Sequence, residues 1–189
     1  MRQLVLSLAM LASLNALADE APWLVEARNV ASTVPPKLLS VLTDEISQGG
    51  PASAIDVCRD KAPAMAKAAS AQSGWAIKRV SLKNRNPKAA PDAWERSTLE
   101  AFDRRAAAGE APASLEAFTS VTTEAGHTEY RYMKALPVQP VCLACHGAAD
   151  TLAPEVSQQL HTLYPGDKAV GYAPGQIRGA MTIRKTLQN

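Results

Sequence analysis

The sequence predicts an α+β fold, with helices in the first half of the chain and a small antiparallel β-sheet in the second. Apolar residues recur at helical spacing between residues 35 and 69, whereas short runs with strand character follow from residue 75 onward. The chain has 189 residues, of which 47% are hydrophobic and 20% are charged, as is typical of a globular protein with one core. No internal repeat or low-complexity linker divides it, so we expect a single domain over residues 19–189.

Residues 1–18 predict a secretory signal peptide. Arg2 precedes an apolar run over residues 4–14, and Ala16 and Ala18 supply small residues before the first acidic residue. This run is too short to cross ~30 Å of hydrocarbon at ~1.5 Å per residue. We therefore expect cleavage after Ala18 and a periplasmic protein without a membrane span.

The charges predict no binding to nucleic acid. The formal net charge is only +2, and basic and acidic residues are interspersed along the chain. Polyanion binding needs clustered Lys and Arg side chains that release many counterions. Nucleic acid is therefore not an expected partner.

Two helices are expected in the first half of the chain. The first is predicted over residues 35–47, where two prolines precede and two glycines follow the periodic residues Leu38, Leu39, Leu42 and Ile46. The second begins at Pro51, and one of its faces carries Ile55, Cys58, Ala62, Met65 and Ala69. Cys58 is therefore expected to point inward. Because proline has no N–H, Pro63 should kink or break this helix near Ala62.

The second half predicts strands with two further helices between them. A strand is expected at residues 75–81, and a helix at residues 92–108 that Gly109 ends. Strand character follows at residues 115–121 and 129–136. Asp150 is expected to cap a short helix that runs to about His161, and apolar alternation predicts a last strand at residues 176–184.

A Cys-x-x-Cys-His motif at Cys142, Cys145 and His146 carries the strongest functional signal. Two residues between the thiols match the spacing of the haem vinyl groups, and the adjacent imidazole can then reach the iron. The chain has three cysteines, so attachment of one haem c would leave Cys58 as a single free thiol. The sequence therefore predicts one covalently bound haem c per chain, with His146 as an iron ligand.

Three other interpretations of the cysteines remain open from the residues alone. A thioredoxin-like redox pair gives no reason for His146 and expects a βαβ context. A structural zinc site needs four ligands and would have to recruit Cys58, His127 or His161 from distant segments. A disulfide between Cys142 and Cys145 leaves Cys58 unexplained.

The sequence resembles a family of single-haem c-type proteins that have a PAS-like fold. The type member of this family is cyanobacterial, and the family is catalogued as a domain of unknown function. The resemblance covers nearly all of the chain after residue 18. It rests on Ala54–Cys58 (A-I-D-V-C), Arg79–Pro87 (R-V-S-L-K-N-R-N-P), Pro91–Glu95 (P-D-A-W-E), Cys142–Gly147 (C-L-A-C-H-G), Tyr164–Lys168 (Y-P-G-D-K), Gly171–Tyr172 (G-Y) and Ile177–Ala180 (I-R-G-A).

The resemblance implies a small antiparallel sheet and N-terminal helices packed around a covalently bound haem c. It implies that Cys142 and Cys145 attach the haem, that His146 is the proximal iron ligand, and that Cys58 is the distal ligand. The residues by themselves leave other distal ligands open: Met65, Met133, Met181, His127 and His161. Any of five basic side chains could pair with the haem propionates: Lys78, Arg79, Lys83, Arg85 and Arg178.

The resemblance favours a module that senses redox state or a small gaseous ligand, with an unknown redox or signalling protein as partner. A periplasmic electron carrier is the alternative, and it requires both iron ligands to persist in both oxidation states. A peroxidase or a sulfur-compound oxidoreductase is the third hypothesis. It would need an open iron position beside acid and base groups, and the sequence shows no recognisable set of them.

Overall fold

A computed structural model describes residues 20–187, so the predicted signal peptide lies outside the described residues. The helices are α1 (Pro22–Asp56), α2 (Ala62–Ser73), α3 (Ala93–Ala107), α4 (Leu143–His146) and α5 (Pro154–Leu163). The strands are β1 (Ala76–Val80), β2 (Glu116–Thr122), β3 (Thr128–Pro137) and β4 (Ile177–Leu187).

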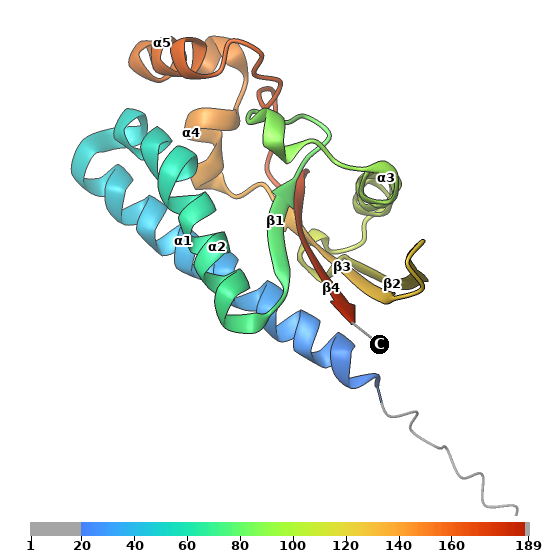
Figure 1. Ribbon diagram of the computed structural model, residues 1–189. Coiled ribbons are helices and arrows are strands. Elements are labelled where there is room, and N and C mark those ends of the chain that lie inside the picture. The colour runs from blue at the N-terminus through green and yellow to red at the C-terminus, as the bar shows by residue number, and fades with distance from the viewer. Residues whose placement is uncertain (1–19, 188–189) are drawn as a thin grey trace, which may run out of the picture.

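The four strands form one antiparallel sheet in the order β1-β4-β3-β2. Helices α1 and α2 lie on one side of this sheet and α3 lies on the other, while α4 and α5 gather at one end (Figure 1). The predicted α+β class and the small antiparallel sheet after the first helices are confirmed.

Successive side chains of β3 and β4 point to opposite faces of the sheet, and each face has its own hydrophobic core. On the face under α1, Tyr132 and Ile183 pack with buried residues of the helix. On the opposite face, Met133 and Ala180 pack with Phe102 of α3. Successive strand residues point to opposite faces, so both faces are covered and β4 is buried from residue 177 to residue 183.

The predicted start of the first helix at residue 35 is wrong, because α1 begins at Pro22. Leu24, Ala27, Ala31 and Val34 are buried against the sheet at steps of three and four residues, which is a helical face. The two prolines that follow lie inside the helix. Packing of this face outweighs the hydrogen bonds that the prolines cannot donate.

The predicted separation of two helices near residue 50 is confirmed, because Gly50 has φ +78° and ψ 176° and interrupts the helical backbone. The predicted irregularity before Pro63 is also present, although it lies one turn earlier than Ala62. Residues Val57–Lys61 form a π-helical turn in which the N–H of Ala62 donates to the carbonyl of Val57. Proline cannot donate to the preceding turn, and wider hydrogen bonds take up the mismatch.

The predicted cap of α5 is wrong. Asp150 lies in a short 3-10 turn, Ala149–Thr151, and the helix begins only at Pro154, with Ala153 before it. Proline is favoured in the first helical turn because its missing N–H is not needed there. The last strand extends three residues beyond its predicted end, to Leu187, because it pairs with the full length of β3.

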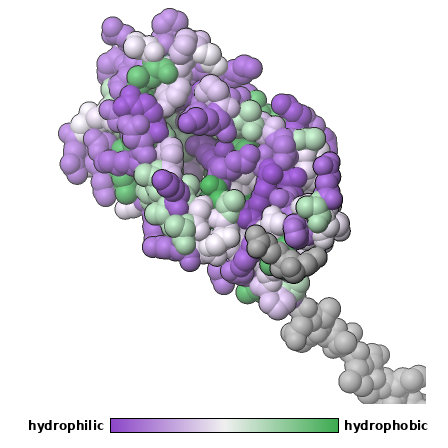
Figure 2. All heavy atoms as spheres, viewed as in Figure 1, coloured by the Kyte–Doolittle hydropathy of each residue, from purple (hydrophilic) through white to green (hydrophobic). Residues whose placement is uncertain are grey.

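Hydrophilic residues cover most of the face in Figure 2, and hydrophobic ones form small separate groups. Within residues 20–187, no helix is both long and apolar enough to cross a membrane.

Candidate functional site

The Cys-x-x-Cys-His motif begins directly after β3, at the end of the sheet where α4 and α5 gather (Figure 1). A 3-10 turn, Pro140–Cys142, leads into the single helical turn of α4, which contains Cys145 and His146. Gly147 ends this turn, where its N–H donates to the carbonyl of Leu143 at 2.9 Å. A Cβ at residue 147 would lie only 2.7 Å from that carbonyl oxygen, so the tight exit requires glycine.

His146 is held as a neutral imidazole with one free nitrogen. Its Nδ1 lies 2.7 Å from the carbonyl oxygen of Ala169, so Nδ1 carries the proton and donates it. Burial and, to a smaller extent, the nearby Arg178 and Arg85 together lower the pKa of His146 to about 2. The Nε2 lone pair is therefore available at neutral pH, as a metal ligand requires.

Arg85 fastens the motif to the segment before β4. Its guanidinium donates to Asp167 at 2.8 Å and to the carbonyl of Cys145 at 2.6 Å. Backbone bonds join the same two segments, since the N–H of Tyr172 donates to the carbonyl of His146 at 3.0 Å. The Tyr172 ring also meets the His146 ring edge to face, with centroids 6.3 Å apart. His146 is thus fixed from two directions.

The three cysteines are free thiols in the described residues. Cys142 and Cys145 are half-buried, and the Sγ of Cys145 lies 3.8 Å from the carbonyl oxygen of Pro51. Burial raises the pKa of Cys145 to about 11, so its thiol is protonated at neutral pH. The motif therefore packs against the C-terminal part of α1, which leads directly to Cys58.

The predicted inward orientation of Cys58 is wrong, because this residue is exposed while Ile55 on the same predicted face is buried. The π-helical turn contains Cys58 and interrupts the 3.6-residue period on which the prediction rested. Although the side chain is exposed to solvent, the protein atoms around it raise the pKa of the Cys58 thiol. The positive charges of Arg79 and Arg85 act in the opposite direction and lower this pKa. Cys58 lies close enough to Cys142 for their charges to interact, so the fold brings the upstream thiol to the motif.

Three of the five candidate propionate partners have no acidic partner among residues 20–187, and two of these three are arginines. Lys78 pairs with Glu95, Arg85 pairs with Asp167, and Lys83 donates to a backbone carbonyl. By contrast, the described residues offer no ion pair to either of two arginines beside the motif: Arg79 and Arg178.

Arg178 is 6% exposed, and its buried Nε has no hydrogen-bond partner within the described part of the chain. Its pKa is lowered to about 9 by burial and by repulsion from Arg79. Burial likewise lowers the pKa of Arg79. Arg178 is buried and Arg79 is half-buried. Because buried cations normally have an anionic partner, the surroundings of these two guanidiniums favour negative charge.

The competing distal ligands lie in other surroundings. Met133 and Met181 are buried in the cores on the two faces of the sheet. His127 precedes β3, whose ten residues at about 3.3 Å each separate it from the motif by ~30 Å. His161 is exposed on α5, and Met65 is half-buried on α2. No group of three or more His, Cys, Asp or Glu side chains in the described residues could hold a metal ion, so they contain no zinc-type ligand set.

Sequence reasoning did not assign roles to Asp167, to the carbonyl of Ala169 or to Tyr172 as a contact of His146. The P-G-D sequence at residues 165–167 indicates a turn, but it carries no information about the partner of Asp167. Arg85 and Asp167 are 82 residues apart, and only the fold joins them.

Comparisons with known proteins identify the fold and the family of the chain. No curated protein matches the chain. One solved structure, titled "Crystal structure of the cyanobacterial heme-protein Tll0287", has the same fold, with a TM-score of 0.65 and 24% sequence identity over 87% of this chain and 95% of that chain. Residues 8–185 match the family described as Tll0287-like, and the chain therefore belongs to the Tll0287-like family.

Proposed function

We propose that this chain is an exported protein that carries one covalently bound haem c and senses redox state or a small ligand. In this proposal Cys142 and Cys145 would attach the haem through thioether bonds, and His146 and Cys58 would bind its iron. Haem supplies a redox-active iron whose potential depends on its ligands. The side chains of the site determine how that iron is held and whether one of its faces can open.

The state of His146 is the observation that carries the proposal. A histidine can bind iron only through a deprotonated nitrogen, and burial beside two arginines keeps this imidazole neutral. The carbonyl of Ala169 fixes the proton on Nδ1 and so directs the other nitrogen outward as a ligand.

Arg79 and Arg178 also support the proposal, because their positive charges are opposite to those of the haem propionates. Haem carries two propionate groups, and the site offers two guanidiniums without a carboxylate partner in the described residues. Arginine binds carboxylates through charge-assisted hydrogen bonds, often two at once. Each propionate could thus offset one buried cation. The related solved structure is that of a cyanobacterial heme-protein, which also favours haem here.

Cys58 would set the chemical character of the site. A thiolate ligand stabilises ferric iron and lowers its reduction potential, whereas methionine raises it. Burial favours the protonated thiol of Cys58, so its bond to the iron competes with protonation. A ligand that leaves when the iron is reduced would open a coordination position, which is how a sensor can register redox state or bind a gas.

The test is a comparison of the periplasmically expressed protein with Cys58→Ala and with Met65→Leu as a matched control on the adjacent helix. We expect a haem that survives denaturing extraction, and low-spin thiolate EPR signals that Cys58→Ala loses and Met65→Leu keeps. Carbon monoxide should bind the reduced wild-type protein. Spectra unchanged in Cys58→Ala would remove Cys58 as the ligand, and a reduced protein that excludes carbon monoxide would favour electron transfer over sensing.

Export is a separate part of the proposal, supported by the sequence of residues 1–18. Mass spectrometry of the protein from a periplasmic extract should show a mature chain that begins at Asp19. Recovery of an unprocessed chain from the cytoplasm would contradict export.

A further inference from the structure

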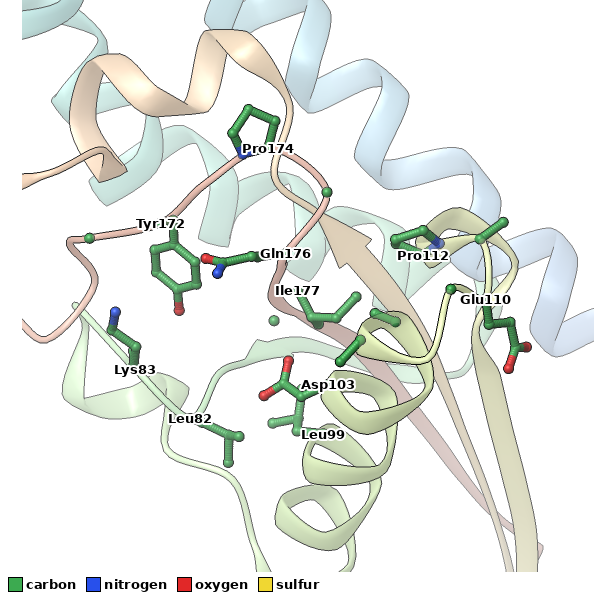
Figure 3. A pocket seen from close by; sticks show the side chains of 17 residues that line it. Leu82, Lys83, Leu99, Asp103, Glu110, Pro112, Tyr172, Pro174, Gln176 and Ile177 are labelled. Carbon is green, nitrogen blue, oxygen red and sulfur yellow. The ribbon is translucent and has the colours of Figure 1, made fainter.

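A cavity lies beside the candidate site, between α3 and the segment that leads into β4. Its volume is about 710 Å³, within the range of small-molecule pockets. Leu99 and Asp103 contribute from α3, and Tyr172, Gln176 and Ile177 contribute from the other side (Figure 3). Neither the Cys-x-x-Cys-His motif nor Cys58 lines it, so an inference about this cavity does not depend on haem binding.

The only positively charged side chain of the lining is already engaged. The Nζ of Lys83 donates to the carbonyl of Val170 at 2.5 Å and lies 4.4 Å from the centroid of the Tyr172 ring. Both contacts hold the ammonium group at the cavity wall. Lys83 is therefore poorly placed to select an anionic ligand.

Among the other polar side chains of the lining, Asp103 differs from its neighbours. Glu110 is paired with Arg105, and the side-chain oxygen of Gln176 accepts from the N–H of Ala173 at 2.9 Å. Asp103 has no hydrogen bond or ion pair within residues 20–187, and its carboxylate points into the cavity (Figure 3). Asp103 is exposed, and its carboxylate is the one acidic group of the cavity lining that has no partner from the described residues.

The surroundings of Asp103 favour a cationic partner over water alone. Leu82, Leu99 and Ile177 form apolar walls around the cavity. Partial burial raises the pKa of Asp103, and the nearby Glu100 raises it further. A positive charge beside the carboxylate would offset both effects, while an apolar body would cover the walls.

We propose that this cavity is a binding site for a small primary amine with a short apolar body, whose ammonium group pairs with the carboxylate of Asp103. Leu99 and Ile177 contact the apolar body, and Tyr172 forms the wall toward His146. The site is separate from the haem motif and shares only the Tyr172 ring with the surroundings of His146.

The experiment is an NMR titration of the purified mature protein with isoamylamine, isoamyl alcohol and isovalerate, which share one apolar body and differ in charge. We expect the amine to bind about tenfold more tightly than the alcohol, because an ion pair adds to the same apolar contact, and isovalerate to bind most weakly. The amide signals of Leu99, Asp103 and Ile177 should shift.

Two variants distinguish a direct contact between the amine and Asp103 from a long-range electrostatic effect of negative charge on α3. Asp103→Asn should weaken amine binding about tenfold, to the affinity of the alcohol, without changing the affinity for the alcohol. Glu100→Gln removes a charge of the same sign from the preceding turn of α3, outside the cavity. This variant should change amine binding by less than about threefold. Equal binding of amine and alcohol, shifts at other residues, or an unaffected Asp103→Asn variant would overturn the proposal, as would absence of amine binding at ~10 mM.

Discussion

Two buried charged groups of this protein, Glu95 and Arg178, differ in how many of their hydrogen-bonding atoms have partners. Glu95 on α3 is fully buried, and it accepts hydrogen bonds from Lys78, Thr182, Arg184 and the backbone of Asp92. Arg178, at the start of β4, is also buried, yet it donates only to a hydroxyl and a carbonyl oxygen of the described residues and lies over the Tyr172 ring. Its Nε has no partner in the described residues.

The difference distinguishes a structural ion network from a binding site. Every partner of Glu95 comes from the chain itself, so folding alone provides what its charge needs. Arg178 and Arg79 need an anion that the described residues do not supply. Folding therefore stabilises the first network and prepares the second region for a ligand.

The largest effect is expected from Glu95→Ala. Its removal leaves Arg184, Lys78 and Thr182 without their shared acceptor, and breaking a buried ion network costs about 3–5 kcal/mol of unfolding free energy. Urea denaturation measures this change. Glu100→Ala on the exposed side of the same helix should stay within about 0.5 kcal/mol. Equal effects of the two variants would show that the network is not structural.

Asp167→Asn should have the next largest effect. Asp167 accepts from Arg85 and from the backbone N–H of Ala169, and hydrogen bonds to charged groups contribute about 2 kcal/mol. The variant should lose this stability, and its haem spectrum should change because the same segment holds His146. Asp150→Asn, at an exposed position, is the control. A stable variant with an unchanged spectrum would exclude a positioning role for the Arg85–Asp167 pair.

Acid should weaken the Glu95 network. Burial alone would raise the pKa values of Glu95 and Asp92, but hydrogen bonds and the nearby arginines lower both below their ordinary values. The folded state therefore binds protons less readily than the unfolded state, and stability is lost as pH falls below about 4.5 toward the lowered values.

Denaturation curves at several pH values measure this loss, which should be smaller in Glu95→Gln than in the wild-type protein. A wild-type unfolding free energy that rises as the pH falls through this window would contradict the assignment.

Arg178→Gln should have the smallest effect on stability. The variant loses hydrogen bonds to neutral oxygens and the contact with the Tyr172 ring. It also removes a buried cation that has no carboxylate partner within residues 20–187, which offsets part of that loss, so the unfolding free energy should fall by about 1 kcal/mol. The fraction of purified chains that carry haem should fall more clearly. Arg96→Gln, exposed on α3, is the matched control. A cost as large as that of Glu95→Ala would place Arg178 with the structural network.

Local patterns were sufficient for several elements. Asp92 and Glu95 form a reciprocal capping box at the start of α3, and Gly109 with φ +93° follows its end, so α3 lies within one residue of its predicted bounds. The strands were predicted for the same reason, since alternation is a property of neighbouring residues. The first half of α1 was missed because two adjacent prolines suggested a helix start, although tertiary packing overrides them.

The sequence by itself determined the Cys-x-x-Cys-His motif, because the spacing of Cys142, Cys145 and His146 is set along the chain. Only the tertiary structure decided the protonation of His146, the link between Arg85 and Asp167, the exposure of Cys58 and the unsatisfied charge of Arg178. The physical reason is that burial and charge pairing depend on groups far apart in the chain, which become neighbours only when the sheet and its helices pack.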